Sequence, residues 1–119
     1  MASALPESNL VPTVRNEGES VIASVRGEID LHNSPQLRTR LLGFIEEQKP
    51  KRLVLNLGEV PYMDSSAIAV LVEALQKMRK AGGKICLTNL QPRVKGLLEI
   101  ARLDSIFVLV KDEAEAMSQ

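Results

Sequence analysis

Cysteine, histidine and aromatic residues are scarce in this chain of 119 residues, which has one Cys, one His, one Tyr, two Phe and no Trp. The lone Cys86 cannot form an intramolecular disulfide, and one Cys with one His cannot build a Cys/His zinc site. So few aromatic rings leave little surface on which bases could stack. The scarce residues therefore argue against disulfide scaffolds, zinc modules and single-strand binders, and we expect no metal and no cofactor.

The chain also lacks an excess of either charge, since 15 basic residues balance 15 acidic ones. Nucleic-acid binders and polybasic membrane-surface proteins need surplus Lys and Arg, so direct nucleic-acid binding is not expected. The first ten residues show no signal-peptide pattern. The best uncharged apolar run, Ala67–Val72, is far shorter than the roughly 20 residues of a spanning helix. We therefore expect a cytoplasmic protein without membrane insertion.

What is present fits one globular domain. The composition is 45% hydrophobic and 25% charged, at a length typical of a single domain. Residues 1–8 are small and polar and are predicted to form a flexible N-terminus. Because no repeat and no linker divides the rest, residues 9–119 are predicted to form one domain.

Strand-like and helix-like segments alternate along the chain. Period-two alternation over Ser20–Ile29 predicts a half-buried strand. Leu10–Arg15 predicts a shorter edge strand, because Pro12 removes a backbone donor, with a turn at Asn16–Gly18. The other predicted strands are Arg52–Leu57, Lys84–Leu90 and Ile106–Val110, and helices are predicted after Pro35 (capped by Asn33 or Ser34), from Ser65, from Pro92 and within Asp112–Gln119.

This alternation predicts the α/β class, with a four- to five-stranded, mostly parallel sheet and an N-terminal edge strand. Most of the strands alternate instead of being continuously apolar, so one face of the sheet should be wetter than the other. We therefore expect helices mainly on one face. The helix from Ser65 should bury Ile68, Leu71, Val72, Leu75 and Met78, and the next helix Val94, Leu97, Leu98 and Ala101.

Motifs of known chemistry are missing. The chain has no phosphate-binding loop, no G-x-G-x-x-G and no G-x-S-x-G elbow. A Ser/His/Asp set could be assembled from Ser65, His32 and either Asp30 or Asp64, but nothing in the spacing supports it, and His32 is expected on a surface loop. The sequence therefore predicts that the protein is not an enzyme.

The informative segment is Asp64-Ser65-Ser66, at the start of a predicted helix. Asp and Ser are preferred helix caps, and capping alone accounts for them. The same place also suits phosphorylation, because a phosphate in the first helical turn meets free N–H groups and the positive dipole end. Capping and phosphorylation are both compatible with the spacing.

Three stretches together resemble the STAS domain of bacterial anti-sigma factor antagonists, over about Val21–Val110. The first is Gly-Glu-Ile-Asp before a polar loop and a helix. The second is a hydrophobic strand followed by Met-Asp-Ser-Ser and an apolar helix. The third is Gly-Gly-Lys, a strand ending in Asn89-Leu90, and Pro92-x-Val94 leading into a Leu-rich helix. The resemblance implies that residues 9–119 form a STAS domain.

The resemblance also implies a function by binding. In this family the dephosphorylated antagonist binds an anti-sigma factor that is also a serine kinase with a histidine-kinase-like ATP site, which frees the sigma factor. The kinase then phosphorylates the Ser after the Asp and so ends binding, and a PP2C-type phosphatase resets the antagonist. Carried onto this chain, Ser65 is the phosphoacceptor, and Asp64, Ser66 and Asp30 belong to the partner-binding surface.

Two positions depart from the family pattern, and one alternative function stays open. Ala67 and Ala69 stand where the family often has Gly, so the helix should be firmer and the approach of a kinase loop more restricted. The alternative is a constitutive, non-phosphorylated STAS subunit of a membrane transporter complex. Such a module need not keep the Asp-Ser pair that this chain has.

Overall fold

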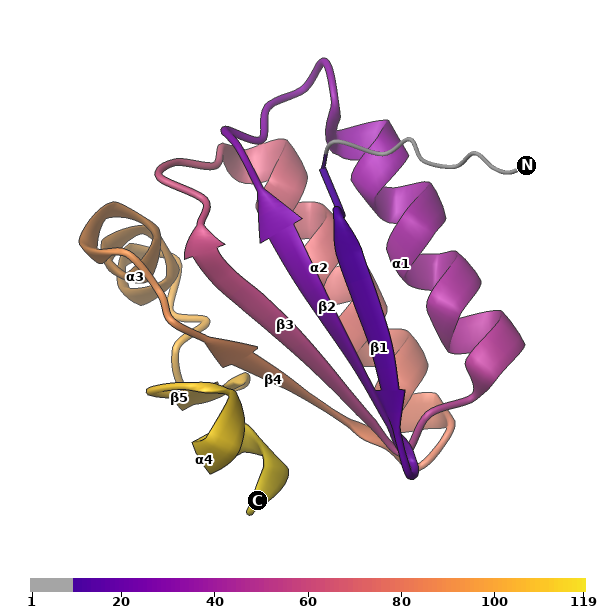
Figure 1. Cartoon of the computed structure of the whole chain (residues 1–119). Helices are drawn as coiled ribbons and strands as arrows, with labels where there is room; N and C mark the ends of the chain where they lie inside the picture. Colours follow the sequence, from indigo (N-terminus) through magenta and orange to yellow (C-terminus); the bar gives the residue numbers. More distant parts are fainter. Residues whose placement is uncertain (1–9) are drawn as a thin grey trace.

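The computed structural model describes residues 10–119 and contains one five-stranded sheet in the order β1-β2-β3-β4-β5 (Figure 1). The predicted flexible segment 1–8 lies outside the described residues. The strands are β1 (Thr13–Glu17), β2 (Ser20–Arg26), β3 (Arg52–Glu59), β4 (Lys84–Thr88) and β5 (Val108–Val110), and the helices are α1 (Ser34–Gln48), α2 (Ser65–Lys80), α3 (Pro92–Ile100) and α4 (Glu113–Met117).

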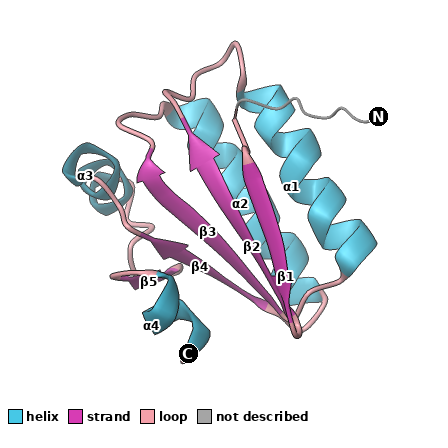
Figure 2. Ribbon diagram, in the orientation of Figure 1, coloured by secondary structure: helices cyan, strands magenta, loops and turns pink. Residues whose placement is uncertain are grey.

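The sheet is mostly parallel. β2, β3, β4 and β5 run parallel to one another, and only the edge strand β1 is antiparallel, to β2. The parallel strands therefore end together at one edge of the sheet, where loops gather (Figure 2). The predicted α/β class, the mostly parallel sheet and the N-terminal edge strand are all confirmed.

The two faces of the sheet are covered unequally. α1 and α2 lie behind the sheet in Figure 1, and α4 lies in front of its β4–β5 side. The main core joins the alternate residues Val21, Ala23 and Val25 of β2 to residues of α1, α2 and α3. A smaller core lies under α4 and consists of Ile22, Val54, Cys86 and Ala116. The prediction that helices lie mainly on one face is confirmed. On the other face, the short helix α4 covers the middle of the sheet, where Ile22, Val54 and Cys86 are buried.

The predicted bounds of all five strands need correction. β3 runs two residues past the predicted Leu57, β4 ends at Thr88 instead of Leu90, and β5 starts at Val108 instead of Ile106.

The differences at β1 and β2 have backbone reasons. β1 starts at Thr13 and continues through Asn16 and Glu17, so the hairpin turn is Gly18-Glu19, with Gly18 at φ 63°. β2 ends at Arg26 instead of Ile29, because Gly27 turns the chain at φ 93°. Ile29 returns to the sheet only through a single parallel bridge to Met63.

The predicted apolar faces of two helices are confirmed in all but one residue. In α2, Leu71, Leu75 and Met78 are buried, and Ile68 and Val72 are half-buried and pack against the core. This face of α2 also buries Ala67, Val70 and Ala74, which were not part of the predicted face. In α3, Val94 and Leu98 are buried and Leu97 packs against the core, whereas Ala101 is exposed just past the last helical residue.

The C-terminus of α2 is closed by two glycines, Gly82 and Gly83. Gly82 adopts φ 80°, its N–H donates to the Arg79 carbonyl at 3.0 Å, and the Gly83 N–H donates to the Met78 carbonyl at 2.8 Å. This pair of bonds is the Schellman motif. Among the helices that the structure describes, none is long and apolar enough to cross a membrane.

We predict opposite effects for alanine at two glycines. A Cβ on Gly83 would lie 2.8 Å from Met78 Cε and 2.9 Å from the Lys51 backbone oxygen, so Gly83→Ala should lower the free energy of unfolding by about 1–3 kcal/mol. Gly43 lies inside α1, and a Cβ added there would meet open space, so Gly43→Ala should raise the free energy of unfolding by about 0.5–1 kcal/mol. Urea denaturation measures the free energy of unfolding of both variants. A change of the same sign and size in both would contradict the packing described around Gly83 and Gly43.

Candidate functional site

The candidate site lies where the chain leaves the C-terminal ends of β2 and β3 (Figure 2). The Ile29 N–H donates to the Tyr62 carbonyl at 3.1 Å, and the Asp64 N–H donates to the Ile29 carbonyl at 3.0 Å. These two bonds tie the segment after β2 to the segment after β3. They place the loop at residues 30–34 beside the first turn of α2.

The Asp64 carboxylate joins this loop to the helix. Oδ1 accepts hydrogen bonds from the Ser66 N–H at 2.9 Å, the Ala67 N–H at 3.4 Å and the Ser66 Oγ at 2.6 Å. Oδ2 accepts from the Leu31 N–H at 3.0 Å, across 33 positions of sequence. The predicted helix cap is confirmed, and the same side chain also holds the neighbouring loop.

These donors stabilise the ionised form of Asp64. The hydrogen bond from the Ser66 hydroxyl, together with the backbone N–H groups of Ser66, Ala67 and Leu31, lowers the pKa of Asp64 below its ordinary value. The partial burial of the carboxyl acts in the opposite direction and is outweighed. The side chain is therefore a carboxylate at neutral pH and carries a negative charge at the start of α2.

The two serines beside Asp64 have different environments. Ser65 is the first residue of α2 and is exposed, and no described residue hydrogen-bonds its hydroxyl. Ser66 is half-buried, and its hydroxyl donates to Asp64. Of these two hydroxyls, only that of Ser65 is both accessible and unengaged within residues 10–119.

Asp30 organises the loop from its own side. Its Oδ1 accepts from the His32 N–H at 2.9 Å and from the Asn33 N–H at 3.2 Å. Its link to the serine pair runs through Leu31, the next residue, whose N–H reaches Asp64. The His32 side chain is exposed, as predicted, and the Asp30 carboxylate is held by backbone N–H groups and not by the imidazole. The structure therefore brings the four predicted site residues to one surface without forming a Ser/His/Asp set.

The predicted capping role of Asn33 or Ser34 is wrong. Asn33 occupies the cap position of α1 but makes no side-chain cap bond. Its Oδ1 accepts from the Asp30 N–H at 2.9 Å and its Nδ2 donates to the Glu28 carbonyl at 3.0 Å, so it braces the loop instead. Ser34 is buried as the first residue of α1. Hydrogen bonds to residues up to five positions earlier in the same loop outweighed the capping preference.

A shallow groove between α1 and α2 adjoins the serines. It encloses about 280 Å³ and is lined by Ser34, Pro35, Arg38, Ser66, Ala69, Val70 and Glu73. Across it Arg38 forms a two-bond ion pair with Glu73, with both N···O distances at 2.7 Å. The Arg38 guanidinium holds the pKa of Glu73 below its ordinary value. This pair spans 35 positions, so the sequence offered no signal for it.

The two alanines that depart from the family pattern lie on different sides of α2. Ala67 is fully buried in the main core, whereas Ala69 is exposed and lines the groove. The expectation that both methyl groups restrict an approaching kinase loop is therefore wrong for Ala67. Only the Ala69 methyl can meet a partner.

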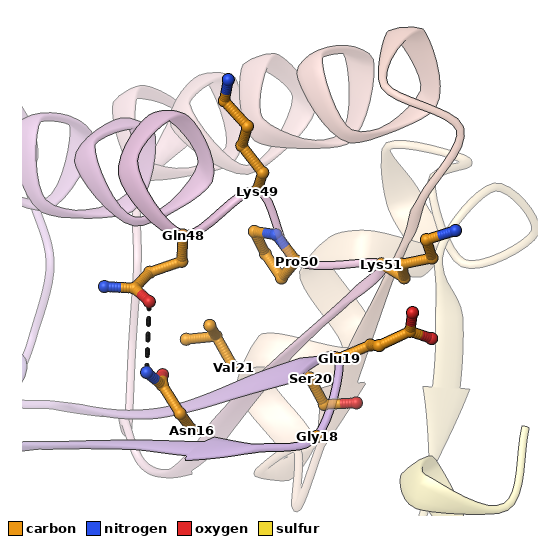
Figure 3. A pocket seen from close by; sticks show the side chains of 9 residues that line it. All are labelled: Asn16, Gly18, Glu19, Ser20, Val21, Gln48, Lys49, Pro50 and Lys51. Carbon is orange, nitrogen blue, oxygen red and sulfur yellow. Dashed lines mark hydrogen bonds between the residues drawn. The ribbon is translucent and has the colours of Figure 1, made fainter.

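A second pocket lies at the opposite end of the sheet, where the α1–β3 connection meets the hairpin turn (Figure 3). It encloses about 240 Å³, and Asn16 Nδ2 donates to Gln48 Oε1 across it at 3.1 Å. The Lys49 side chain points away from it in Figure 3. This pocket contains none of the predicted site residues.

Comparison with known proteins identifies the family to which the domain is related. The sequence profile of the STAS domain matches residues 11–116. The anti-sigma-B factor antagonist of Bacillus subtilis (strain 168) is 32% identical over 106 residues, covering 88% of this chain and 95% of that protein. A crystal structure of an anti-sigma factor antagonist from Mycobacterium paratuberculosis superposes with a TM-score of 0.80 at 24% identity, covering 89% of both chains.

A relative of another kind also matches. A Bacillus subtilis (strain 168) protein that bears the name of a sulfate transporter, YvdB, is 30% identical over 92 residues. The match covers 77% of this chain but only 17% of that protein. The likeness is therefore to one part of a much longer chain.

We predict that the Asp64 carboxylate makes stability depend on pH. Because its pKa is lowered by folding, its contribution is present above the unfolded-state pKa of about 3.9 and is lost as the pH falls through the folded-state value. Asp64→Asn keeps one cap oxygen but removes the charge and the acceptor of the Leu31 N–H, so it should lower Tm by about 3–6 °C at pH 7. Thermal unfolding followed by circular dichroism should show this gap closing as the pH is lowered.

Ser66→Ala provides the matched control. It removes the hydrogen bond that lowers the pKa of Asp64 most, while the backbone N–H bonds remain. The change of Tm between neutral and acid pH should therefore become smaller than in the wild type without disappearing. A gap between the wild type and Asp64→Asn that stays constant from neutral to acid pH would contradict the role of the carboxylate charge.

Proposed function

The chain belongs to the STAS domain family, and we propose that it is an anti-sigma factor antagonist of a bacterial partner-switching system. In this proposal the dephosphorylated protein binds an anti-sigma factor that is also a serine kinase with a histidine-kinase-like ATPase fold. Binding releases the sigma factor. Phosphorylation of Ser65 then ends binding, and a PP2C-type serine phosphatase restores the active form.

The observation that carries the proposal is the contrast between the two serines. The Ser65 hydroxyl is exposed and unengaged in the described chain, while the Ser66 hydroxyl donates to Asp64 at 2.6 Å. A kinase therefore meets one free acceptor next to a fixed carboxylate. The name of the Bacillus subtilis relative, which this chain matches over 95% of that protein's length, supports the same role.

The partner-binding surface consists of Asp30, Asp64 and Ser66 around the acceptor. Asp64 and Ser66 define the first turn of α2 through their mutual hydrogen bond. Asp30 holds the adjacent loop through the N–H groups of His32 and Asn33. In this proposal these residues present Ser65 on a rigid surface and do no chemistry themselves.

Phosphorylation can switch binding without refolding the domain. A phosphate adds about −1.5 to −2 charge and three acceptor oxygens at the contact surface. The added charge falls beside the Asp64 carboxylate, in a chain of zero formal net charge. Asp64 already accepts hydrogen bonds from the N–H groups of Ser66 and Ala67, and the positive end of the α2 dipole favours a further anion there. A contact penalty of only about 1.4 kcal/mol would weaken the complex tenfold.

The alternative function is that of a constitutive STAS subunit in a membrane transporter complex. The match to the transporter-named relative favours it, although that match covers 17% of the relative. This alternative requires neither a free Ser65 nor a kinase. Co-purification of a transporter ATPase in place of a soluble kinase would favour it.

We predict that Ser65 is the one major phosphorylation site. Each serine kinase of the anti-sigma factor class encoded in the source genome is purified and incubated with the protein and radiolabelled ATP. One of them should label the wild type and Ser66→Ala, whereas Ser65→Ala should lose more than about nine-tenths of the label, because it lacks the acceptor oxygen. Labelling of Ser65→Ala at the wild-type level would contradict the assignment.

We also predict that a negative charge at position 65 weakens kinase binding. Ser65→Asp should reduce the affinity about tenfold or more by isothermal titration calorimetry, through repulsion at the contact surface. Its fold should remain intact, because an acidic residue in the first turn of a helix is favourable. Ser65→Ala is the matched control and should bind as the wild type does. Equal affinities of Ser65→Asp and Ser65→Ala would count against the switch.

A further inference from the structure

We propose that Leu31 is an apolar anchor that the kinase partner buries when it binds this domain. In this proposal Leu31 supplies much of the binding affinity, and phosphorylation of Ser65 switches binding off. This inference rests on the proposed function and deepens it, since it names the residue that the partner buries. The partner feature that it requires is an apolar pocket beside the kinase active site. None of the acceptor chemistry depends on Leu31.

The exposure of Leu31 is the first observation. Three large hydrophobic side chains are exposed in the described part of the chain, and Leu31 is 76% exposed. A single exposed leucine is ordinary on a protein surface. What distinguishes Leu31 is its place, because its backbone N–H bonds directly to Asp64, the residue before the acceptor serine.

The backbone that carries Leu31 is held on both sides. Before it, the Asp30 N–H donates to Asn33 Oδ1 at 2.9 Å. After it, the His32 N–H donates to Asp30 Oδ1 at 2.9 Å and the Ser34 N–H donates to the Asp30 carbonyl at 2.8 Å. Leu31 itself is tied to Asp64 at 3.0 Å. The side chain is thus presented from a loop that is already ordered, which lowers the entropy cost of burying it in a complex.

The size of a protein interface places Leu31 beneath the partner. A standard interface covers about 800 Å² per partner, which corresponds to a disc of about 16 Å radius. Leu31 is one hydrogen bond from Asp64, and Asp64 precedes Ser65 directly. A kinase that phosphorylates Ser65 therefore has to cover Leu31. Interfaces draw most of their affinity from a few desolvated anchors near the centre. Among the large hydrophobic residues exposed in the described chain, Leu31 is the one whose backbone bonds to this site.

Substitutions of the anchor Leu31 and of residues that shape the acceptor turn should change different kinetic constants. An anchor contributes equally to binding before and during phosphoryl transfer, so its removal raises KM and leaves kcat unchanged. A residue that merely shapes the acceptor turn would lower kcat when removed. The two roles of this surface can therefore be told apart in one assay.

The probe is the purified kinase that labels Ser65 in the assay above, with KM and kcat measured for phosphorylation and the affinity by calorimetry. Leu31→Ala and Leu31→Gln should weaken binding about tenfold or more and raise KM by a similar factor, with kcat and Tm unchanged. Leu31→Met should keep the affinity within about threefold, because it restores apolar volume.

Ile100→Ala is the matched control, since Ile100 is 83% exposed at the end of α3, an element that supplies no residue to this site. It should bind like the wild type. If Leu31→Ala binds like Ile100→Ala while Ser65 is still labelled, the anchor is refuted and the proposed function stands. A fall in kcat with unchanged KM also refutes the anchor. If no kinase labels the wild type at Ser65, the proposed function fails and the anchor fails with it.

Discussion

The Asp64 carboxylate is the constraint on which the candidate site depends. One oxygen caps α2 through Ser66 and Ala67, and the other holds the Leu31 N–H from a loop 33 positions earlier. The two segments are also joined by the backbone bonds between Ile29 and the residues around Met63. Because one side chain satisfies donors from both segments, the loop and the helix start are ordered together. The same hydrogen bonds stabilise the ionised carboxylate and so lower the pKa of Asp64.

The parallel sheet explains why these segments meet. β2 and β3 are neighbours in the same direction, so the connections that follow them leave from one edge. α1 and α2 then start side by side and are joined across the groove by the Arg38–Glu73 ion pair. This arrangement leaves Ser65 exposed and bonds the Ser66 hydroxyl to Asp64. A binding surface of this kind can be altered by a single charge without disturbing the core below it.

Much of the fold was predictable because its signals are local. The alternation of Val21, Ala23 and Val25 predicts a strand, and Asp64 before Ser65 predicts a capped helix; both are confirmed. The failures arose where hydrogen bonds within a loop, or a bridge to a distant segment, outweighed the capping and alternation signals. Asn33 braces Glu28 and Asp30 instead of capping, and Gly27 ends β2 early so that Ile29 can bridge to Met63. The predicted apolar face of α2 is confirmed but incomplete, because whether short residues such as Ala67 and Ala74 are buried depends on what packs against them.

The sequence by itself determined the α/β class, the mostly parallel sheet with its N-terminal edge strand, and the identity of the Asp-Ser-Ser turn, because periodicity, caps and turn residues act over a few positions. Only the tertiary structure decided how the members of that turn differ. It left the Ser65 hydroxyl free in the described chain and bound that of Ser66, and it brought Leu31 to Asp64. It also put the Ala67 methyl in the core and that of Ala69 in the groove. These differences arise from the direction of each side chain in the folded chain and from hydrogen bonds between segments far apart in sequence, neither of which a local pattern can encode.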